Sequence, residues 1–546
     1  MAVVKFNISD LKAHGIEKEA IKELTERLGM SLEALDQETA AIDITPNRPD
    51  MLDIIGFARA ASFLVDRKTP KEKFYSLKGG PAMHLKVDRS VKRIRPYCAA
   101  MVVKNVNLSG NGLKNLINFT EKFCDTYGRK RRKIAIGLHN LDDIVGDLTY
   151  AAARDREIVP LGSKTQERFI DVLKNNEKGI EYSYTLQGIR NYPFISDSKK
   201  TISLVPIINS EYTRVTERTK NLLVEMTSTS LNAVESAINM IACSFIDAGA
   251  DVYSCEIDYG TKKRVTPQLE YRTIKLRKSK AEKTLGVYLE DKRMIGLANR
   301  LGNVAAKYGS YTLIYVPPYR LDVLNEQDVI EDIAIAYGYD KIEPLPIYGF
   351  SVGTAEEYSE YSNRISLAAL GLGFTEAINP YLTNEDLNFK KMGREYKEQS
   401  VIQVAYAKEN FTMLRTALLP GLMQNLSSSV HCKMPQRIFE IGKVFSTDKE
   451  KVSEKTNIGM VCEHSRANYS EMKAVIANIL KSSGRSYSLE TAKDGAFIDG
   501  RCARIMVNGK QVGIFGEIHP KVLESFRLEE PAIAAEIDLE GIMDRS

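Results

Sequence analysis

Four acidic residues between positions 322 and 332 have the types and the spacing of a metal site. Asp328, Glu331 and Asp332 recur at i, i+3 and i+4, so on a helix they would share one face. Asp322 precedes them, and a turn over residues 323–325 would direct its carboxylate back toward the others. Oxygen ligands of this kind suit Mg²⁺. A purely structural interpretation stays open, because acids in a first helical turn also stabilise the positive end of the helix dipole.

A helix over residues 326–337 is predicted to carry these acids. Asn325 is suited to cap its start, Asp328 stands three residues later as in a capping box, and Gly338 follows the last apolar turn as a stop. An apolar stripe at helical spacing is formed by Val329, Ile330, Ile333, Ala336 and Tyr337.

A polar loop near position 210 provides a second group of candidate binding residues. Its hydrogen-bonding side chains lie between two predicted strands and belong to Asn209, Ser210, Glu211, Thr213 and Thr216. They include no evident nucleophile paired with a base, a composition that suits a pocket orienting a polar ligand and a water molecule. A solvated turn is the alternative, because such residues dominate loops. A helix capped by Ser230 and ended by Gly249 is predicted to follow.

A run of five adjacent cations, Arg129 to Lys133, follows a helix predicted over residues 113–127. Lys and Arg supply the sequence-independent part of RNA phosphate binding. Such a block is also common in solvated loops, so both interpretations stay open. His139, a few residues later, is predicted to be structural, because no Ser or Cys with a partnered acid adjoins it.

The composition limits the other function classes. The 546 residues are enough for several domains, and 43% hydrophobic residues are enough for their cores. A formal net charge of +5 is too small for a protein that coats nucleic acid, so any RNA contact must be local. Seven cysteines without a CxxC pair predict a reducing compartment and no zinc site. No stretch has the ~18 continuous apolar residues of a membrane span, and the first residues are unlike a signal peptide, so a cytoplasmic protein without a membrane partner is expected.

The stretch PPYRLDVLNEQDVIEDIAIAYGYDKI, which starts at Pro317, closely resembles the B5 domain of phenylalanyl-tRNA synthetase beta subunits of the archaeal and eukaryotic type. The resemblance implies a Mg²⁺ ion at the junction with the alpha subunit. Its ligands would be Asp322, Asp328, Glu331 and Asp332. A separate stretch, ITPNRPDMLDIIGFARA from Ile44, matches the first domain of the same subunits.

The segment between residues 203 and 249 resembles the B3/B4 domain, which in this family hydrolyses mischarged Tyr-tRNA(Phe). A second, hydrolytic step is valuable there, because an apolar pocket discriminates poorly against one added hydroxyl. The resemblance implies editing residues at Asn209, Glu211, Thr213, Thr216, Glu225 and Thr227. Family members commonly show a VTGTD-like run after an Asp, and this chain departs from that pattern with Glu225 and Ser228.

From residue 347 the chain resembles the B6/B7 module, which copies the class II synthetase fold. A turn into a helix at Pro420-Gly421 and a strand in RIFEIGKVF are predicted. Class II enzymes bind ATP through an R-x-E core, whereas Arg437 and Glu440 have the wrong spacing. The module is therefore predicted to be inert and to pack against a catalytic partner.

The resemblance implies an α+β multidomain fold with B1 at residues 1–80, B3/B4 at 81–265, B5 at 266–346 and B6/B7 at 347–546. It implies a beta subunit of an (αβ)₂ heterotetramer, in which the alpha subunit uses ATP to join phenylalanine to tRNA(Phe) and this chain edits. Two alternatives stay open. One is a scaffold that binds RNA or a partner without editing, and the other is a free-standing editing hydrolase.

Overall fold

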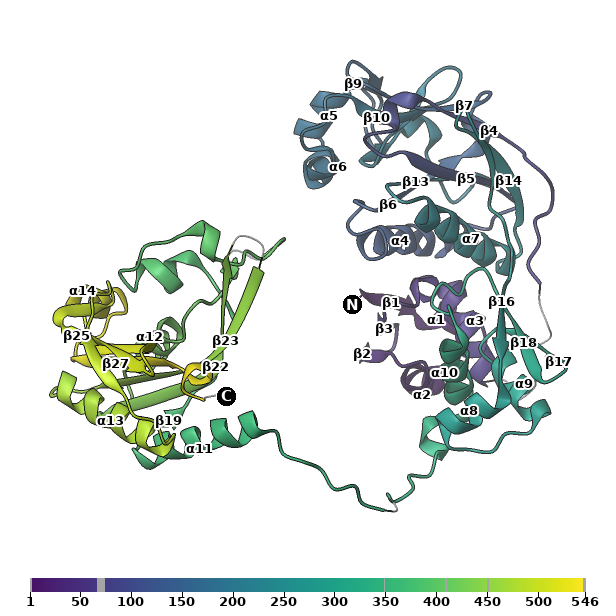
Figure 1. Cartoon of the computed structure of the whole chain (residues 1–546). Helices are drawn as coiled ribbons and strands as arrows, with labels where there is room; N and C mark the ends of the chain where they lie inside the picture. Colours follow the sequence, from purple (N-terminus) through teal and green to yellow (C-terminus); the bar gives the residue numbers. More distant parts are fainter. Residues whose placement is uncertain (1, 66–73, 348, 408–409, 449–450, 544–546) are drawn as a thin grey trace. The chain divides into compact units, whose positions relative to one another are not determined.

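The computed structural model of the chain describes residues 2–65, 74–347, 349–407, 410–448 and 451–543. The chain forms two compact units, Met1–Pro346 and Ile347–Ser546 (Figure 1). Both units mix helices with mainly antiparallel sheets, so the predicted α+β multidomain class is confirmed.

The first unit begins with a three-stranded antiparallel sheet of order β1-β3-β2. A short 3₁₀ turn, Pro49–Leu52, connects β3 to α3 and buries Asp50, whose carboxylate pairs with Arg48 at 2.9 Å. Gly56 is required in α3, because a Cβ there would clash with the Asp50 carbonyl. The elements of this part are β1 (Ala2–Asn7), α1 (Ile8–Ala13), α2 (Ile21–Arg27), β2 (Ser31–Leu35), β3 (Thr39–Ile44) and α3 (Ile54–Val65).

A ten-stranded sheet follows, with the order β12-β11-β10-β7-β4-β14-β5-β13-β6 and β15 paired to β14. Its end strands meet, because the Asn209 amide on β12 donates to the Leu138 carbonyl on β6 at 3.1 Å, and the sheet becomes nearly a barrel. The strands are β4 (His84–Val87), β5 (Tyr97–Lys104), β6 (Ile134–Asn140), β7 (Leu148–Ala153), β10 (Tyr192–Ser196), β11 (Thr201–Leu204), β12 (Ile208–Asn209), β13 (Asn221–Ser228), β14 (Asp251–Asp258) and β15 (Lys263–Thr266).

Two helices, α4 (Gly112–Asp125) and α7 (Leu231–Asp247), cover one face of this sheet beside β5, β13 and β6 (Figure 1). Both helices were predicted, and Ser230 and Gly249 stand at the ends of α7 as expected. The Ser230 side chain makes no capping hydrogen bond, and the Ser230 amide donates to the Ser228 hydroxyl. The remaining small elements are β8 (Glu157–Ile158), β9 (Glu167–Arg168), α5 (Phe169–Asn175) and α6 (Glu177–Tyr182).

The last part of the first unit places α10 (Glu326–Tyr337) beside a sheet of order β16-β18-β17. The bounds of α10 are those predicted from the sequence, and Asn325 and Asp328 make both halves of the capping box. Gly338 ends the helix with φ +98°. The other elements are β16 (Arg272–Leu276), α8 (Lys278–Leu285), α9 (Asp291–Asn299), β17 (Val304–Tyr308) and β18 (Tyr311–Val316).

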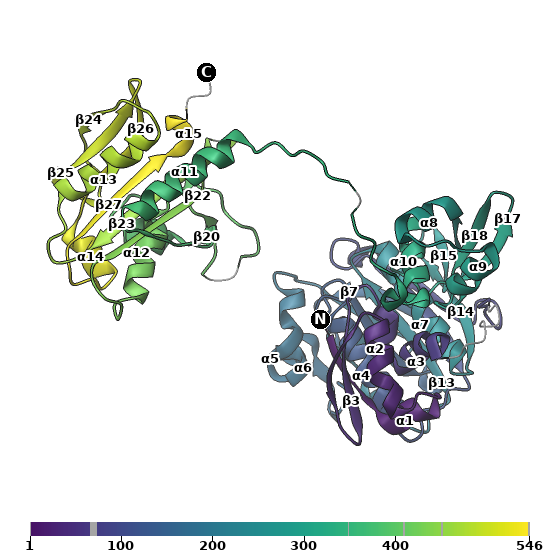
Figure 2. The ribbon, with the colours of Figure 1, turned by 90° about the horizontal axis from the view of Figure 1, so that it is seen from below.

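The second unit is a sheet of order β19-β22-β23-β27-β26-β25-β24, antiparallel except where β19 joins β22. Its two faces carry separate cores, one with α11 and α13 and the other with α12 and α14 (Figure 2). The strands are β19 (Thr375–Glu376), β22 (Gln436–Asp448), β23 (Lys451–Glu463), β24 (Ser488–Thr491), β25 (Phe497–Val507), β26 (Lys510–Ile518) and β27 (Ala532–Asp538). The helices are α11 (Glu357–Gly371), α12 (Leu419–Ser428), α13 (Tyr469–Ser482) and α14 (Pro520–Ser525). The predicted helix at Pro420 and strand at RIFEIGKVF are both present.

Candidate functional site

The four acids predicted as metal ligands line one cavity of about 700 Å³ in the first unit. Arg48 and Pro49, from the turn after β3, line the same cavity. Two segments singled out in the sequence, nearly 300 positions apart, therefore meet at one place. The four acids are Asp322, Asp328, Glu331 and Asp332.

Arg320 lies between two of these acids. Its guanidinium donates to Asp332 Oδ1 and Oδ2 at 2.7 and 3.0 Å, and to Asp322 Oδ1 and Oδ2 at 2.9 and 2.8 Å. Asn303 adds a bond of 2.7 Å to Asp332 Oδ2. Burial raises the pKa of Asp322, but the charge and hydrogen bonds of Arg320, together with the charge of Arg48, lower it further, so the pKa of this carboxyl lies below its ordinary value. Arg320, which is 2% exposed, is not among the residues predicted from the sequence.

The other two acids have oxygens available to a ligand. Asp328 Oδ2 accepts the Leu324 and Asn325 amides at 2.7 and 2.9 Å, whereas Glu331 is exposed and has no hydrogen bond or ion pair with a described residue. The donors are all oxygen, which suits a hard cation. No three of the four carboxylates place an oxygen each within 4.8 Å of one another. The chain's own residues thus fit a cation mainly through Glu331 and Asp328, because Arg320 already balances Asp322 and Asp332.

Three residues of the ten-stranded sheet region form a buried polar cluster, which we call the barrel cluster: Thr213, His139 and Glu225. Thr213 Oγ1 lies 2.7 Å from His139 Nδ1, and His139 Nε2 lies 3.9 Å from Glu225 Oε1. The three residues are between 0 and 3% exposed. Within the part of the chain that the structure describes, His139 Nε2 and Glu225 Oε2 have no hydrogen-bond partner. An imidazole and a carboxylate that face each other across such a gap could orient a water molecule or accept its proton.

Strand register explains how this cluster forms. Glu225 on β13 stands opposite Gly137 on β6, two residues before His139. A Cβ at position 137 would clash with the Glu225 carboxylate, so the glycine makes room for the acid. The sequence analysis treated His139 as structural. The glycine two positions earlier in the same predicted strand was the one signal that could have drawn attention to it.

Two further predicted residues lie on strands next to the barrel cluster. Thr227, on the same strand as Glu225, accepts hydrogen bonds from the buried Arg95 at 3.0 Å through its hydroxyl and 2.7 Å through its carbonyl. Asn209 accepts from the Ser203 hydroxyl at 3.2 Å while its amide holds β12 against β6. Four of the six predicted editing residues therefore lie on or beside the strands that build the cluster.

The structure does not bring the other two, Glu211 and Thr216, into the cluster. The Glu211 carboxylate accepts the Gly162 amide at 2.7 Å and pairs with Arg214 at 3.0 Å, and the Gly162 bond holds the pKa of this carboxyl below its ordinary value. Glu211 lines a different cavity, of about 870 Å³. Thr216 makes a local turn in which its hydroxyl accepts the Arg218 amide at 3.3 Å.

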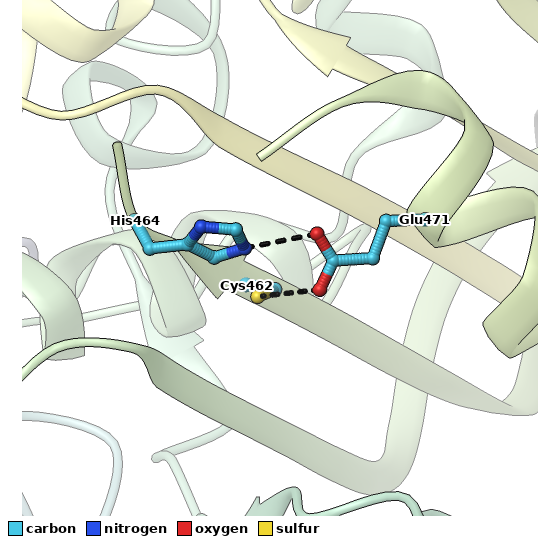
Figure 3. Close-up of side chains that lie close together, drawn as sticks. All are labelled: Cys462, His464 and Glu471. Carbon is cyan, nitrogen blue, oxygen red and sulfur yellow. Dashed lines mark hydrogen bonds and ion pairs between the residues drawn. The ribbon is translucent and has the colours of Figure 1, made fainter. Parts of the chain in front are cut away.

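In the second unit, Cys462, His464 and Glu471 form the one group of potential metal ligands, among the described residues, whose donor atoms lie within 4.8 Å of one another. Glu471 contacts His464 Nε2 at 2.9 Å and Cys462 Sγ at 3.8 Å (Figure 3). Arg437 also donates to Glu471 at 2.9 Å and balances its charge. Burial raises the pKa of Cys462 to about 11, so the thiol is protonated at neutral pH. The group ties the end of β23 to α13.

Three family models identify the chain as a multidomain tRNA synthetase chain. Residues 80–243 match the B3/4 domain model, residues 274–339 the tRNA synthetase B5 domain and residues 344–539 the phenylalanyl tRNA synthetase beta chain CLM domain. No helix in the described residues is long and apolar enough to cross a membrane.

Relatives that match over nearly the whole length of the chain identify the family within this class. The chain is 34% identical to the phenylalanine–tRNA ligase beta subunit of Archaeoglobus fulgidus, with 97% of this chain and 96% of the relative covered. It is 31% identical to that of Methanococcoides burtonii, over 99% and 100%. An N-terminal fragment of the phenylalanyl-tRNA synthetase beta subunit from Pyrococcus horikoshii is similar in structure, with a TM-score of 0.59 and 28% identity over 62% of this chain and 100% of the fragment. The chain belongs to the family of phenylalanine–tRNA ligase beta subunits.

Proposed function

We propose that this chain is the beta subunit of a cytoplasmic (αβ)₂ phenylalanine–tRNA ligase, in which the alpha subunit carries the aminoacylation site. The alpha subunit would use ATP to join phenylalanine to tRNA(Phe). Family membership carries this proposal. In the second unit, Arg437 pairs with Glu471, and Glu440 pairs with Arg415. The charged side chains of the strand that would carry an ATP-binding arginine therefore form structural ion pairs within the protein.

The surface of the second unit supports a protein partner. Leu367 and Leu370 on α11 are 68% and 46% exposed, and Ile378 after β19 is 89% exposed. Large apolar side chains that are exposed together often mark a site where another protein binds. Co-expression with a candidate alpha subunit should give a complex of tetramer size that forms Phe-tRNA only when both chains are present. Failure to associate would contradict the subunit role.

The barrel cluster carries the proposal that this chain hydrolyses Tyr-tRNA(Phe). Glu225 and His139 are buried and face each other, and His139 Nε2 and Glu225 Oε2 have no hydrogen-bond partner in the described chain. Asn209, Thr213 and Thr227 would shape the pocket around them, and Glu211 and Thr216 would lie farther out. The purified complex should deacylate Tyr-tRNA(Phe) much faster than Phe-tRNA(Phe).

The alternatives give different results in the same assay. No deacylation by a complex that still makes Phe-tRNA would favour a scaffold without editing. Deacylation by this chain alone, together with failure to bind any alpha subunit, would favour a free-standing editing hydrolase.

The acids at the α10 cavity are proposed to hold Mg²⁺ at the contact with the alpha subunit. Glu331 and Asp328 would supply the available oxygens, while Asp322 and Asp332 share their charge with Arg320. Bound there, the cation would offset repulsion among the carboxylates. Glu331→Gln should lower the Mg²⁺ content and weaken binding of the alpha subunit, whereas Glu343→Gln, at another exposed acid, should not. Unchanged metal content and assembly would count against the site.

We propose that the chain has four domains: B1 at residues 1–80, the editing domain at 81–265, B5 at 266–346 and the inert catalytic-like module at 347–546. The three family matches support it, because each falls close to one of the last three segments.

A further inference from the structure

The loop of residues 128–133, which we call the basic loop, presents five consecutive cations between α4 and β6. Arg129, Lys130 and Arg132 are exposed. None of the five cations forms an ion pair with a described residue. Glu181, an acid beside Arg131, pairs with Lys178 instead at 3.0 Å. Five adjacent positive charges create a positive electrostatic potential at this loop, and no ion pair within the described chain neutralises it.

The backbone of the basic loop is strained. Arg129, Lys130 and Arg131 have φ angles of +52°, +50° and +62°, a region that residues with a Cβ rarely enter, and here three do so in succession. Gly128 is required before them, because a Cβ there would clash with the carbonyls of Cys124 and Ile134. Strain of this kind persists only where the surroundings impose it, and it gathers at functional sites.

The surroundings hold the loop through its carbonyl groups. Arg95 donates to the carbonyls of Arg131 and Arg132 at 3.0 and 3.2 Å, and the Tyr184 hydroxyl donates to that of Lys130 at 2.6 Å. Arg95 is buried and also binds Thr227 on β13, the strand of Glu225. The same side chain therefore fixes the basic loop and the strand that carries the barrel cluster.

The side chains of the loop differ in whether they bind the rest of the protein. Arg131 is the anchor, since it donates to the carbonyls of Pro206 and Ile207 at 3.1 and 2.7 Å and lies 3.8 Å above the Tyr182 ring. Arg132 lies 4.9 Å from the Tyr184 ring. The three exposed cations make no side-chain hydrogen bond within the described chain. Cations interleaved with aromatic rings are typical of surfaces that bind single-stranded nucleic acid, where rings stack on bases and cations contact phosphates.

We propose that the basic loop binds the phosphodiester backbone of tRNA beside the barrel cluster and guides the aminoacylated 3′ end toward it. Arg129, Lys130 and Arg132 contact phosphates, whereas Arg131 and Arg95 position the loop. This inference rests on the proposed function, because it takes the RNA to be the tRNA whose ester bond the cluster hydrolyses. A rigid loop suits this role, because its cations keep their positions when the RNA arrives.

The test is the binding of uncharged tRNA(Phe) transcript to the full chain in complex with its alpha subunit, over a series of salt concentrations. In the loop variant Arg129→Gln, Lys130→Gln and Arg132→Gln, the slope of log Kd against log salt should fall by about three, because each of the three lost phosphate contacts removes about one. At low salt Kd should rise about tenfold.

The control variant removes three exposed cations that lie on or near β4 and β14, strands at least three places from β6 in the sheet order: Lys86→Gln, Arg89→Gln and Lys262→Gln. It should bind like the wild type. Because a triple variant can lose stability, the thermal midpoint is measured for each protein, and the single variants Arg129→Gln and Lys130→Gln are each expected to lower the slope by about one.

A loop variant with the Kd and salt slope of the wild type would overturn the inference. Equal losses in the loop and control variants would overturn it as well, because binding would then follow total charge. Loop-dependent binding in a complex that does not deacylate Tyr-tRNA would contradict only the editing proposal. A wild-type complex that binds no tRNA would overturn both.

Discussion

Asp332 and Glu225 are carboxylates buried to nearly the same degree in the first unit, and their surroundings differ in one respect. Asp332 receives two hydrogen bonds from Arg320 and one from Asn303. Glu225 faces His139 across 3.9 Å, and its Oε2 has no hydrogen-bond partner in the described chain. Asp332 is thus paired with an arginine, whereas Glu225 forms no ion pair with an arginine or lysine of the described chain.

The difference separates structural from chemical roles. A buried carboxylate paired with an arginine fixes the segments that carry the pair, although its net contribution to stability is modest. A buried acid without a partner costs stability, and such groups persist mainly where a ligand or a water molecule completes them. We therefore infer that Arg320 supports the architecture of the α10 cavity, and we propose a chemical role for Glu225.

Removing the arginine should have the largest effect. Arg320→Met would leave Asp322 and Asp332 buried without their cation, and we expect the free energy of unfolding of the first unit to fall by about 3–5 kcal/mol. Urea unfolding followed by circular dichroism measures this loss. Arg277→Gln, which breaks an exposed ion pair with Glu326, should cost much less. A similar loss in both variants would remove the distinction between the two kinds of acid.

A middle-sized effect is expected within the barrel cluster. Thr213→Val keeps the shape of the side chain but removes the hydroxyl next to His139 Nδ1. Leaving this buried nitrogen without a partner should cost about 1–3 kcal/mol of unfolding free energy. Thr216→Val, at an exposed threonine of the same loop, should change it by less than about 0.5 kcal/mol. If the two variants are equally stable, the hydrogen bond to His139 is not part of the cluster.

The smallest effect on stability is expected for the ion pair between Glu326 of α10 and the exposed Arg277. Hydrogen bonds from Arg277 lower the pKa of Glu326 from 4.5 to about 2. The folded state thus favours the charged form of the Glu326 carboxylate. Its contribution to the free energy of unfolding is fully present above pH 4.5, decreases as the pH falls and is lost below about pH 2. Glu326→Gln should reduce stability by at most about 1 kcal/mol at pH 7. The difference from the wild type, followed by thermal unfolding between pH 7 and 2, should vanish in acid; a constant difference would contradict the ion pair.

The sequence predicted local structure well where a few neighbouring residues decide it. Asn325, Asp328 and Gly338 fixed both ends of α10, because caps and stops depend on residues within one turn. The roles of Arg320 and His139 could not be predicted in the same way. Arg320 acts on an acid twelve positions away, and His139 gains its partners from a loop and a strand more than seventy residues later in the chain. The contact of His139 depends on sheet register, and that of Arg320 depends on how α10 packs beside the preceding turn; one sequence specifies neither.

The basic loop shows the same limit. The sequence revealed its charge but not its left-handed backbone, because Arg95 and Tyr184, which impose that conformation, lie 36 and 54 positions away. Likewise, Glu211 belongs to the polar loop by composition, yet a bond to Gly162 directs it into another cavity.

The role of the barrel cluster is tested most directly by the rate of Tyr-tRNA(Phe) hydrolysis in a complex that carries Glu225→Gln. The rate should fall about 100-fold or more, the size typical for a group that acts on the reacting water. Phe-tRNA formation should be unchanged, and the free energy of unfolding should stay close to that of the wild type, because Gln has nearly the shape of Glu and Glu225 forms no ion pair with an arginine or lysine of the described chain. Full hydrolysis by this variant, or a loss of activity that merely follows unfolding, would show that the barrel cluster is structural and would contradict the central claim.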